Sequence, residues 1–322
     1  MRRRTKRMGG RRTTIYIIVV GLLLAAHYLY DNFAPEVVVA AEPSEEVAPI
    51  EDPSAEAAPR KTTGTQWAEL PAMKRQSDDI YITSHHSGEM RNYTVCYSSE
   101  HHAPLWVAAP RHRAYTGDVK RVDNYDFDPT LPVNIQTRLN RSYGDYTRGH
   151  MLGSAERTAT THMNNQTFYV TNIAPQLRDG FNERGGAWNN LEYFVDKQVC
   201  ADTLYVVTGA IYERFTDSDG TTIEPRTTKN KNDGKLIGVP TAYYKVLLRT
   251  KSGRTGRSVR ECSASELKCA AFIVGHRSAS GRKPSAKDMI PVRELERMTG
   301  IDFFAAVPNA PEKEANAADW GL

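Results

Sequence analysis

The sequence has little cysteine and no cysteine motif that would hold a metal. Its 322 residues include four cysteines, and none of them stands in a Cys-x-x-Cys pair or alternates with histidine at ligand spacing. This argues against a cysteine-held zinc site. The chain also lacks an internal repeat, while 40% hydrophobic and 25% charged residues are ordinary for a globular protein.

Neither sign of charge dominates. The formal net charge is +4, from 42 Lys and Arg against 38 Asp and Glu. Residues 1–12 carry seven Lys or Arg and no acid, whereas residues 31–59 carry eight Asp or Glu and no base, so the rest of the chain is mildly basic. Such an excess favours a polyanionic partner but is far below the charge density of a dedicated nucleic-acid coat protein.

Long apolar runs are scarce, and the clearest one is residues 15–29, directly after the basic cluster. It is shorter than the roughly 20 residues of a comfortable transmembrane helix, and no small-residue cleavage site follows at once. We expect residues 1–30 to be an uncleaved signal anchor with its basic side in the cytoplasm. The chain after residue 30 would then be exported, to a periplasmic or other extracytoplasmic location. A cleaved signal peptide and an Arg-rich mitochondrial presequence stay open as alternatives.

Composition divides the remaining chain into three parts. Residues 31–66 are acidic and rich in Pro, Ala and Glu, which predicts a disordered tether. Residues 67–307 are of a size that suits one α/β domain. Residues 308–322, rich in Ala and Glu, are expected to form a loosely held tail.

Periodicity predicts a mixture of strands and helices in this domain. A helix is expected over residues 187–200, because Trp188, Leu191, Val195 and Val199 recur at helical spacing. A closing helix should begin at Pro291 and end at Gly300. Residues 118–132 are polar and are expected to form a loop between regular elements, which we call the polar excursion. Strands are expected at residues 93–97, 104–108, 167–171, 203–211, 242–248 and 270–274.

The even cysteine count makes disulfides plausible in an exported chain. Cys262 and Cys269 are close in sequence and could staple a hairpin, which would leave Cys96 with Cys200. Four cysteines allow three pairings, and the sequence does not choose among them.

Polar residues with complementary chemistry gather between residues 147 and 192. His150 can take a proton, and Arg148 can face a phosphate. Asn182 and Glu192 offer oxygen atoms of the kind that a hard cation prefers, and Asn172 is a further amide at the end of an expected strand. Each has an ordinary structural interpretation alone, as a surface charge or a turn residue. Together they indicate metal-dependent cleavage of phosphodiesters.

The order of these residues resembles the DNA/RNA non-specific endonucleases, a family with secreted and mitochondrial members. The elements that carry the resemblance are Arg148-Gly149-His150, Thr171-Asn172-Ile173-Ala174-Pro175-Gln176, Phe181-Asn182 and Trp188 with Leu191-Glu192. The resemblance implies an α/β (α+β) domain, the ββα-metal nuclease fold, with a central, mainly antiparallel sheet flanked by helices. It also implies a phosphodiester hydrolase that cuts DNA and RNA without sugar specificity.

The resemblance assigns a role to each residue. His150 would be the general base, Arg148 would contact the phosphate, and Glu192 would hold metal-bound water. Asn182 would be the ligand of one Mg²⁺, with Mn²⁺ as a substitute. Asn172 would contact the substrate or support the ligand from behind, and it is the second choice for the ligand itself.

Two departures from the family pattern leave alternatives open. Thr147 stands where the family commonly has Asp, and the segment between Asn182 and Trp188 is two residues longer than usual, with Gly185-Gly186 in it. A catalytically inactive nucleic-acid-binding protein on the same scaffold is one alternative, and a phosphodiesterase for another phosphoester is the second. The expected partners are DNA and RNA through phosphate contacts and a membrane through the N-terminal segment, and a homodimer stays open.

Overall fold

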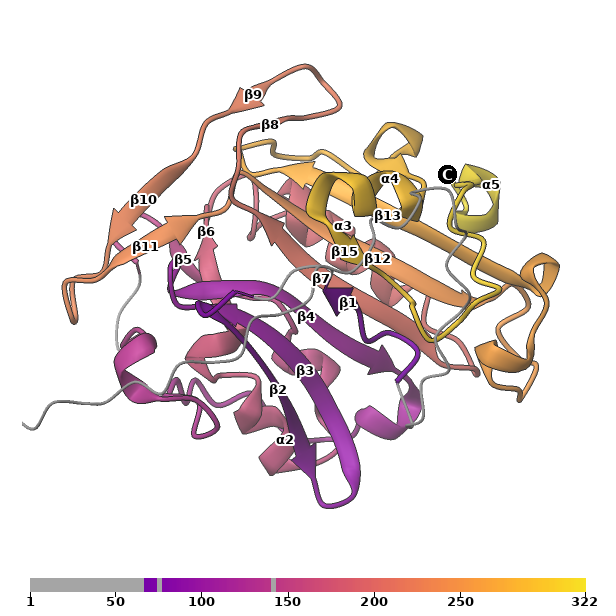
Figure 1. The fold of residues 1–322 in the computed structure, drawn as a ribbon, viewed down its shortest axis with the longest axis horizontal. Helices are drawn as coiled ribbons and strands as arrows, with labels where there is room; N and C mark the ends of the chain where they lie inside the picture. The colour runs from indigo at the N-terminus through magenta and orange to yellow at the C-terminus, as the bar shows by residue number, and fades with distance from the viewer. Residues whose placement is uncertain (1–66, 74–76, 140–142) are drawn as a thin grey trace, which may run out of the picture. The chain divides into compact units, whose positions relative to one another are not determined.

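A seven-stranded antiparallel sheet forms the frame of the structure (Figure 1). The computed structural model describes residues 67–73, 77–139 and 143–322, so the predicted anchor and tether lie outside the described residues. Every neighbouring pair in the sheet is antiparallel. In spatial order the strands are β14 (Met289–Ile290), β13 (Leu267–Gly275), β12 (Ala242–Thr250), β7 (Leu204–Ile211), β4 (Ala103–Arg111), β3 (Met90–Ser98) and β2 (Ile80–Ser87).

Both faces of the sheet are buried, and alternation along the strands supplies two separate cores. On β12, Tyr243 and Leu247 join one cluster, whereas Tyr244 and Val246 join the other, as the two-residue period of a strand requires. The helix α3 (Ala187–Asp196) packs on the first face, and α4 (Val292–Thr299) packs on the second. The candidate site therefore belongs to the first face.

Short ribbons and helices surround this sheet. The ribbons are β5 (Thr147–His150) with β6 (Ile173–Gln176), β10 (Arg226–Lys229) with β11 (Leu236–Val239), β8 (Phe215–Thr216) with β9 (Thr222–Ile223), and β1 (Ala72–Met73) with β15 (Ile301–Asp302). The other helices are α2 (Thr161–Gln166) and α5 (Ala317–Trp320). This mixed α/β architecture, with one large antiparallel sheet and few helices, confirms the predicted fold class.

The periodicity of apolar residues predicted the two helices well, but it also predicted one short strand that is absent. The closing helix lies between Pro291 and Gly300 as predicted, and α3 begins at Ala187 but ends at Asp196 rather than at residue 200. The strand predicted at residues 167–171 is absent, because these residues form turns and the 3₁₀ turn η4 (Val170–Asn172). The strand β6 begins only after Asn172.

The C-terminal segment is packed against the domain, contrary to the expectation of a loose tail. Trp320 is 3% exposed and contacts the ring of Phe272 edge-on, with the ring centroids 6.1 Å apart. The ammonium group of Lys268 lies 4.3 Å from the Trp320 ring centroid. Burying a large apolar side chain contributes about 1.5–3 kcal/mol, so the burial of Trp320 favours the packed position of the C-terminal segment.

The disulfides that the even cysteine count made plausible are not formed, and all four cysteines are free thiols. Cys96 lies on β3 in the second core, whereas Cys200 lies beyond α3 beside Gly253. Cys262 is the C-cap of a 3₁₀ turn, and Cys269 is buried within β13. Burial raises the pKa of the Cys96 thiol to about 12, so this thiol is protonated and unreactive at neutral pH.

In the described ranges, no helix is both long enough and apolar enough to cross a membrane. The apolar run at residues 15–29, on which the anchor prediction depends, lies outside those ranges.

Candidate active site

The ribbon β5–β6 carries the Arg-Gly-His motif, with Arg148 opposite Pro175 and His150 opposite Ile173. His150 is thus the last residue of a strand rather than a loop residue. Gly149 is required by close packing, because a Cβ atom at this position would lie 2.1 Å from the side chain of Gln176. The glycine lets Gln176 cover the ribbon and leaves the flanking Arg148 and His150 half-buried.

One pocket of about 410 Å³ brings most of the predicted residues together. Two larger hollows, of about 520 and 450 Å³, lie elsewhere and contain none of them. The residues that line the pocket come from the polar excursion, from β5 and the turn after it, from the segment that leads into α3, and from α3 itself: Arg121, Asp123, Tyr125, Thr147, Arg148, His150, Gly153, Arg178, Asn182, Glu183 and Glu192.

His150 is held by aromatic packing, with one ring nitrogen left unpartnered. Its ring meets Phe168 at 87° with centroids 5.0 Å apart and meets Tyr125 at 5.8 Å. Its Nε2 atom is buried and has no hydrogen-bond partner among the described residues. Burial, together with the charge of Arg121, lowers the pKa of His150 to about 3, so the imidazole is neutral near pH 7. A neutral imidazole with a free nitrogen can accept a proton.

Thr147, the departure from the family pattern, orients Asn182. The Thr147 hydroxyl donates to the carbonyl of Gln176 at 3.1 Å, so its contact with Asn182 must have the amide Nδ2 as donor, at 3.2 Å. This bond fixes the amide plane and leaves the Asn182 Oδ1 atom as the free acceptor. An amide oxygen is a suitable ligand for a hard cation.

The two additional residues before Trp188 are absorbed in a tightly wound turn. The N–H of Ala187 donates to the carbonyl of Gly180, and the N–H of Asn189 donates to that of Phe181. Gly186 lies so close to this backbone that an added Cβ atom would be 2.3 Å from the Phe181 nitrogen. The insertion therefore coils back on itself, and Asn182 still lines the same pocket as Glu192.

Glu192, on the second turn of α3, is a half-buried carboxyl without an ion-pair partner among the described residues. Burial raises its pKa to about 7, against the opposing charge of Lys245 and with the help of the nearby Glu156 and Asp196. A carboxyl in this state gains from a nearby cation, which would favour its ionised form.

Arg148 is fixed from two sides. One of its Nη atoms donates to the carbonyl of Leu139 at 2.9 Å, and its guanidinium carbon lies 3.7 Å from the ring centroid of Tyr125. Stacking and one hydrogen bond leave the remaining N–H groups available while the group still lines the pocket. This is a suitable arrangement for contacting a phosphate oxygen.

Asn172 does not line the pocket, and its side chain forms hydrogen bonds to the turn after His150. Its Oδ1 accepts from the N–H of Leu152, and its Nδ2 donates to the carbonyls of Leu152 and Thr167. The residue is fully buried. Of the two asparagines singled out in the sequence, Asn182 lines the pocket and Asn172 holds the backbone behind it.

Comparison with known proteins identifies the family. The model of the DNA/RNA non-specific endonucleases matches residues 81–310 of this chain. The chain belongs to this family and is an endonuclease. A nuclease from Nostoc is 30% identical over 222 residues, which cover 67% of this chain and 73% of that protein. Human mitochondrial endonuclease G is 25% identical over 222 residues, covering 68% of each chain.

The comparison extends to a yeast protein and to a solved structure. The mitochondrial nuclease of Saccharomyces cerevisiae is 25% identical over 234 residues, covering 69% of this chain and 66% of the yeast protein. A chain in the crystal structure of the EndoG/EndoGI complex superposes with a TM-score of 0.53 at 26% identity, covering 70% of this chain and 85% of that one.

Sequence reasoning missed a charged rim around the pocket of this nuclease. Arg121 and Asp123 form an ion pair at 2.7 Å, and Arg178 lies 3.9 Å from Glu183. The excursion at residues 118–132 was predicted only as polar, although an excursion of this length without secondary structure often serves a binding site. That length was the one available signal.

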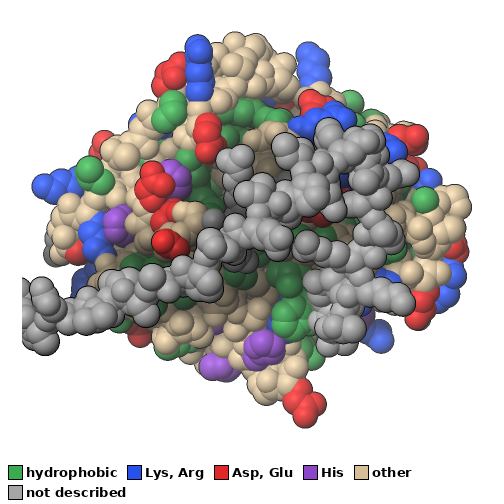
Figure 2. All heavy atoms as spheres, in the orientation of Figure 1, with side chains coloured by type: hydrophobic (Ala, Val, Ile, Leu, Met, Phe, Trp, Pro, Cys, Tyr) green, Lys and Arg blue, Asp and Glu red, His purple; other side chains and the backbone are tan. Residues whose placement is uncertain are grey.

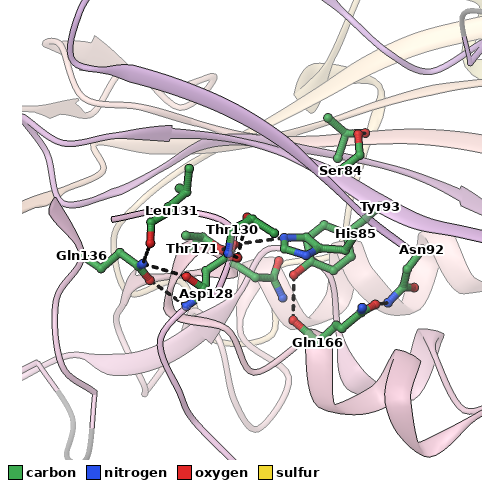
Figure 3. A network of polar contacts seen from close by, with 12 residues as sticks. Ser84, His85, Asn92, Tyr93, Asp128, Thr130, Leu131, Gln136, Gln166 and Thr171 are labelled. Atoms are coloured by element: carbon green, nitrogen blue, oxygen red, sulfur yellow. Dashed lines mark hydrogen bonds and ion pairs between the residues drawn. The ribbon is translucent and has the colours of Figure 1, made fainter. Parts of the chain in front are cut away.

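A buried network behind the pocket positions the nuclease's excursion (Figure 3). Nε2 of His85, on β2, lies 3.0 Å from Oδ2 of Asp128, and both side chains are almost completely buried. The same carboxylate accepts from the hydroxyl of Thr171 at 2.6 Å and from the N–H and hydroxyl of Thr130. Because Thr171 precedes Asn172, this network connects the pocket rim to the turn after His150.

Replacing Asp128 with Asn is expected to lower the free energy of unfolding by about 3 kcal/mol at pH 7, because an amide cannot accept from all these donors. Burial raises the pKa of Asp128, but the contacts with His85, Thr171 and Thr130 outweigh it, and the net pKa is lowered. The carboxylate therefore stabilises the fold above a pH of about 4, and this contribution is lost as the pH falls further.

Urea unfolding at pH 7 and at pH 3 measures this difference. The gap between wild type and Asp128→Asn should narrow at the lower pH, whereas the exposed control Asp118→Asn should match wild type at both. Equal stability of all three proteins at pH 7 would contradict the structural role.

Proposed function

We propose that this endonuclease hydrolyses the phosphodiester bonds of DNA and RNA with His150 as the general base and one Mg²⁺ held at Asn182. The observation that carries the proposal is the joint placement of His150, Asn182 and Glu192 around one pocket, although they come from separate segments of the chain. The unpartnered Nε2 of His150 supports its role as a base.

The donor atoms of the pocket suit a hard cation. No group of three or more His, Cys, Asp or Glu in the described ranges could hold a metal, so a closed site of the zinc type has no support there. Asn182 Oδ1 and the Glu192 carboxylate are oxygen donors, and Mg²⁺ usually takes few protein ligands and keeps several waters. Mn²⁺ prefers similar ligands and is expected to substitute. When bound, the ion supplies positive charge beside the phosphate.

The protein's own groups account for the rest of the chemistry. His150 takes the proton of the attacking water at its free nitrogen, because the imidazole is neutral near pH 7. Arg148 donates its remaining N–H groups to the phosphate, where negative charge develops in the transition state. Glu192 orients water by accepting its hydrogen bonds. Thr147 keeps the Asn182 amide in the orientation that presents its oxygen.

We expect the pocket to recognise the phosphate groups of the substrate and not its bases. Its lining is dominated by charged and amide groups, and contacts to phosphate carry no sequence information. We therefore expect the enzyme to cut DNA and RNA with little preference for sequence or sugar.

A nuclease assay on the full-length chain tests the proposal. Plasmid DNA and ribosomal RNA are incubated with Mg²⁺, with Mn²⁺, and with EDTA, and products are followed on gels. Both polymers should be degraded with either metal, and EDTA should abolish the activity. No degradation with either metal, or undiminished degradation in EDTA, would refute the proposal.

We also propose that the nuclease domain lies outside the cytoplasm, where it cannot reach the cell's own chromosome. The basic N-terminus followed by an apolar run supports export with an N-terminal anchor. The names of the human and yeast relatives support the mitochondrial alternative. Fractionation followed by protease protection separates the two placements, and a domain found free in the cytosol would contradict both.

A further inference from the structure

The hairpin β10–β11 presents cations beside the catalytic ribbon. It packs against β6, the strand that pairs with β5, and Figure 1 shows the hairpin projecting at the same end of the molecule as β5 and β6. Lys229 and Lys231 are exposed on it, and Arg138 is exposed beside its turn. None of these three forms an ion pair in the described part of the chain. Figure 2 shows blue side chains along the left margin, where the hairpin projects in Figure 1.

The hairpin is anchored firmly at both ends. At its base, the N–H of Gly238 donates to the carbonyl of His101 at 2.8 Å, and an added Cβ at Gly238 would lie 2.9 Å from the His101 ring. At its turn, the buried Asn230 donates to the hydroxyl of Thr137 and to the carbonyl of Arg138. A surface fixed in this way loses little conformational entropy when it binds a partner.

The turn is connected to Arg148 through the backbone of residues 138 and 139. Arg148 donates to the carbonyl of Leu139, and the preceding carbonyl, of Arg138, accepts from both Asn230 and Asn232. At the other end of β10, the Arg226 guanidinium lies 5.8 Å from the ring of Tyr146, which directly precedes Thr147. The turn and the base of the hairpin are therefore each linked to residues beside the pocket.

Two acidic residues near the hairpin already make polar contacts within the domain. Asp233 accepts from the N–H of Arg138 at 2.8 Å and from the hydroxyl of Thr137, and Glu224 is paired with Arg214. Lys235 is also used internally, because its ammonium donates to the carbonyls of Asn134 and Gln136. Lys229, Lys231 and Arg138 are left facing solvent, and each carries a positive charge.

We propose that the hairpin is a second contact surface for the substrate, at which Lys229, Lys231 and Arg138 bind backbone phosphates of a polynucleotide whose scissile bond lies in the pocket. This inference rests on the proposed function and specifies a polymeric substrate. A pocket of about 410 Å³ is of a size for a small ligand and admits only the part of a polymer around the reacting phosphate. The neighbouring phosphates must lie outside it, and a polyanion is attracted to unpaired cations.

The test compares the full-length double variant Lys229→Gln/Lys231→Gln with wild type on two substrates. One is a duplex of several hundred base pairs, and the other is bis(4-nitrophenyl) phosphate, a diester without a polymer chain. On the duplex, we expect KM to rise about 10-fold at low salt with kcat unchanged, and the slope of log(kcat/KM) against log[salt] to become shallower by about 2. The small diester should be cleaved at the wild-type rate.

A control variant loses the same two positive charges at a surface away from the hairpin. Lys287 and Lys313 are exposed, on segments outside the pocket, and Lys287→Gln/Lys313→Gln should leave KM and the salt slope close to wild type. The proposal is overturned if the hairpin variant behaves like this control on duplex DNA, or if it loses activity equally on the small diester, which would indicate damage to the pocket.

Binding separates this proposal from the function on which it rests. Fluorescence anisotropy in EDTA measures the affinity for labelled duplex without turnover. If wild type binds more tightly than the hairpin variant but cleaves neither substrate, the hairpin contact holds and the catalytic function fails. If wild type cleaves both substrates but the variants bind alike, the function holds and the hairpin contact fails.

Discussion

Replacing His150 with alanine is expected to lower kcat by about 10²–10⁴ while leaving KM for DNA, the fold and Mg²⁺ binding nearly unchanged. In the proposed function the imidazole lowers the activation barrier as a general base, and losses of this size are typical for such a group. Burial, together with the Arg121 charge, lowers the pKa of His150 to about 3, so the residue is neutral from about pH 5 upward. The loss should therefore be similar at about pH 6 and at about pH 8.

His162 provides the matched control. It is exposed on α2, outside the pocket, and its ring contacts only Gln166 among the hydrogen-bonding groups described. Steady-state kinetics of both variants, with thermal unfolding to confirm the fold, decide the assignment. A His150→Ala enzyme that keeps more than about a third of wild-type activity would remove His150 from the mechanism, and an equal loss in His162→Ala would point to a general effect on stability.

Asn182→Ala and Glu192→Gln are each expected to raise the Mg²⁺ concentration for half-maximal activity by about 10–100-fold. In the proposed function Asn182 is a direct oxygen ligand and the Glu192 charge orients bound water. Loss of a group that orients a ligand typically has an effect of this size, and loss of a ligand should have at least as large an effect. Both side chains line the pocket, so neither change should disturb the core. Activity is measured against Mg²⁺ concentration at saturating DNA.

Asn172→Ala supplies the contrast to Asn182→Ala. Its three side-chain hydrogen bonds are all to backbone groups, so the variant should lose about 2–3 kcal/mol of stability and keep the wild-type Mg²⁺ requirement. A larger Mg²⁺ shift in Asn172→Ala than in Asn182→Ala would mean that the longer turn has moved the ligand and that the assignment of Asn182 is wrong.

Local sequence patterns were sufficient to predict the helices whose apolar residues recur at helical spacing. Trp188, Leu191 and Val195 recur at helical spacing and form the buried face of α3, and the segment from Pro291 to Gly300 begins and ends as predicted. The order of Arg148, His150, Asn182 and Glu192 was readable as a set only through its resemblance to the nuclease family. Helical spacing depends on interactions within a few residues, which a sequence displays directly.

Local patterns failed where a distant partner decided the outcome. Residues 167–171 have the composition of a strand, but the side chain of Asn172 bonds back to Thr167 and Leu152 and delays the strand β6. The composition around Trp320 predicted a loose tail, but in the structure Trp320 packs against the ring of Phe272 and the ammonium group of Lys268. Long-range contacts outweigh intrinsic propensity in such short segments.

The sequence by itself displayed the polar residues of the candidate site, their order and two well-placed helices, and its resemblance to the nuclease family implied the antiparallel α/β fold. Only the tertiary structure decided which asparagine lines the pocket, that Thr147 can orient Asn182, and that Arg121 and Tyr125 join the site from a polar excursion. It also decided that the cysteines stay apart as free thiols. The physical reason is that a pocket is defined by the directions of side chains from several segments, and those directions are set when the segments pack together.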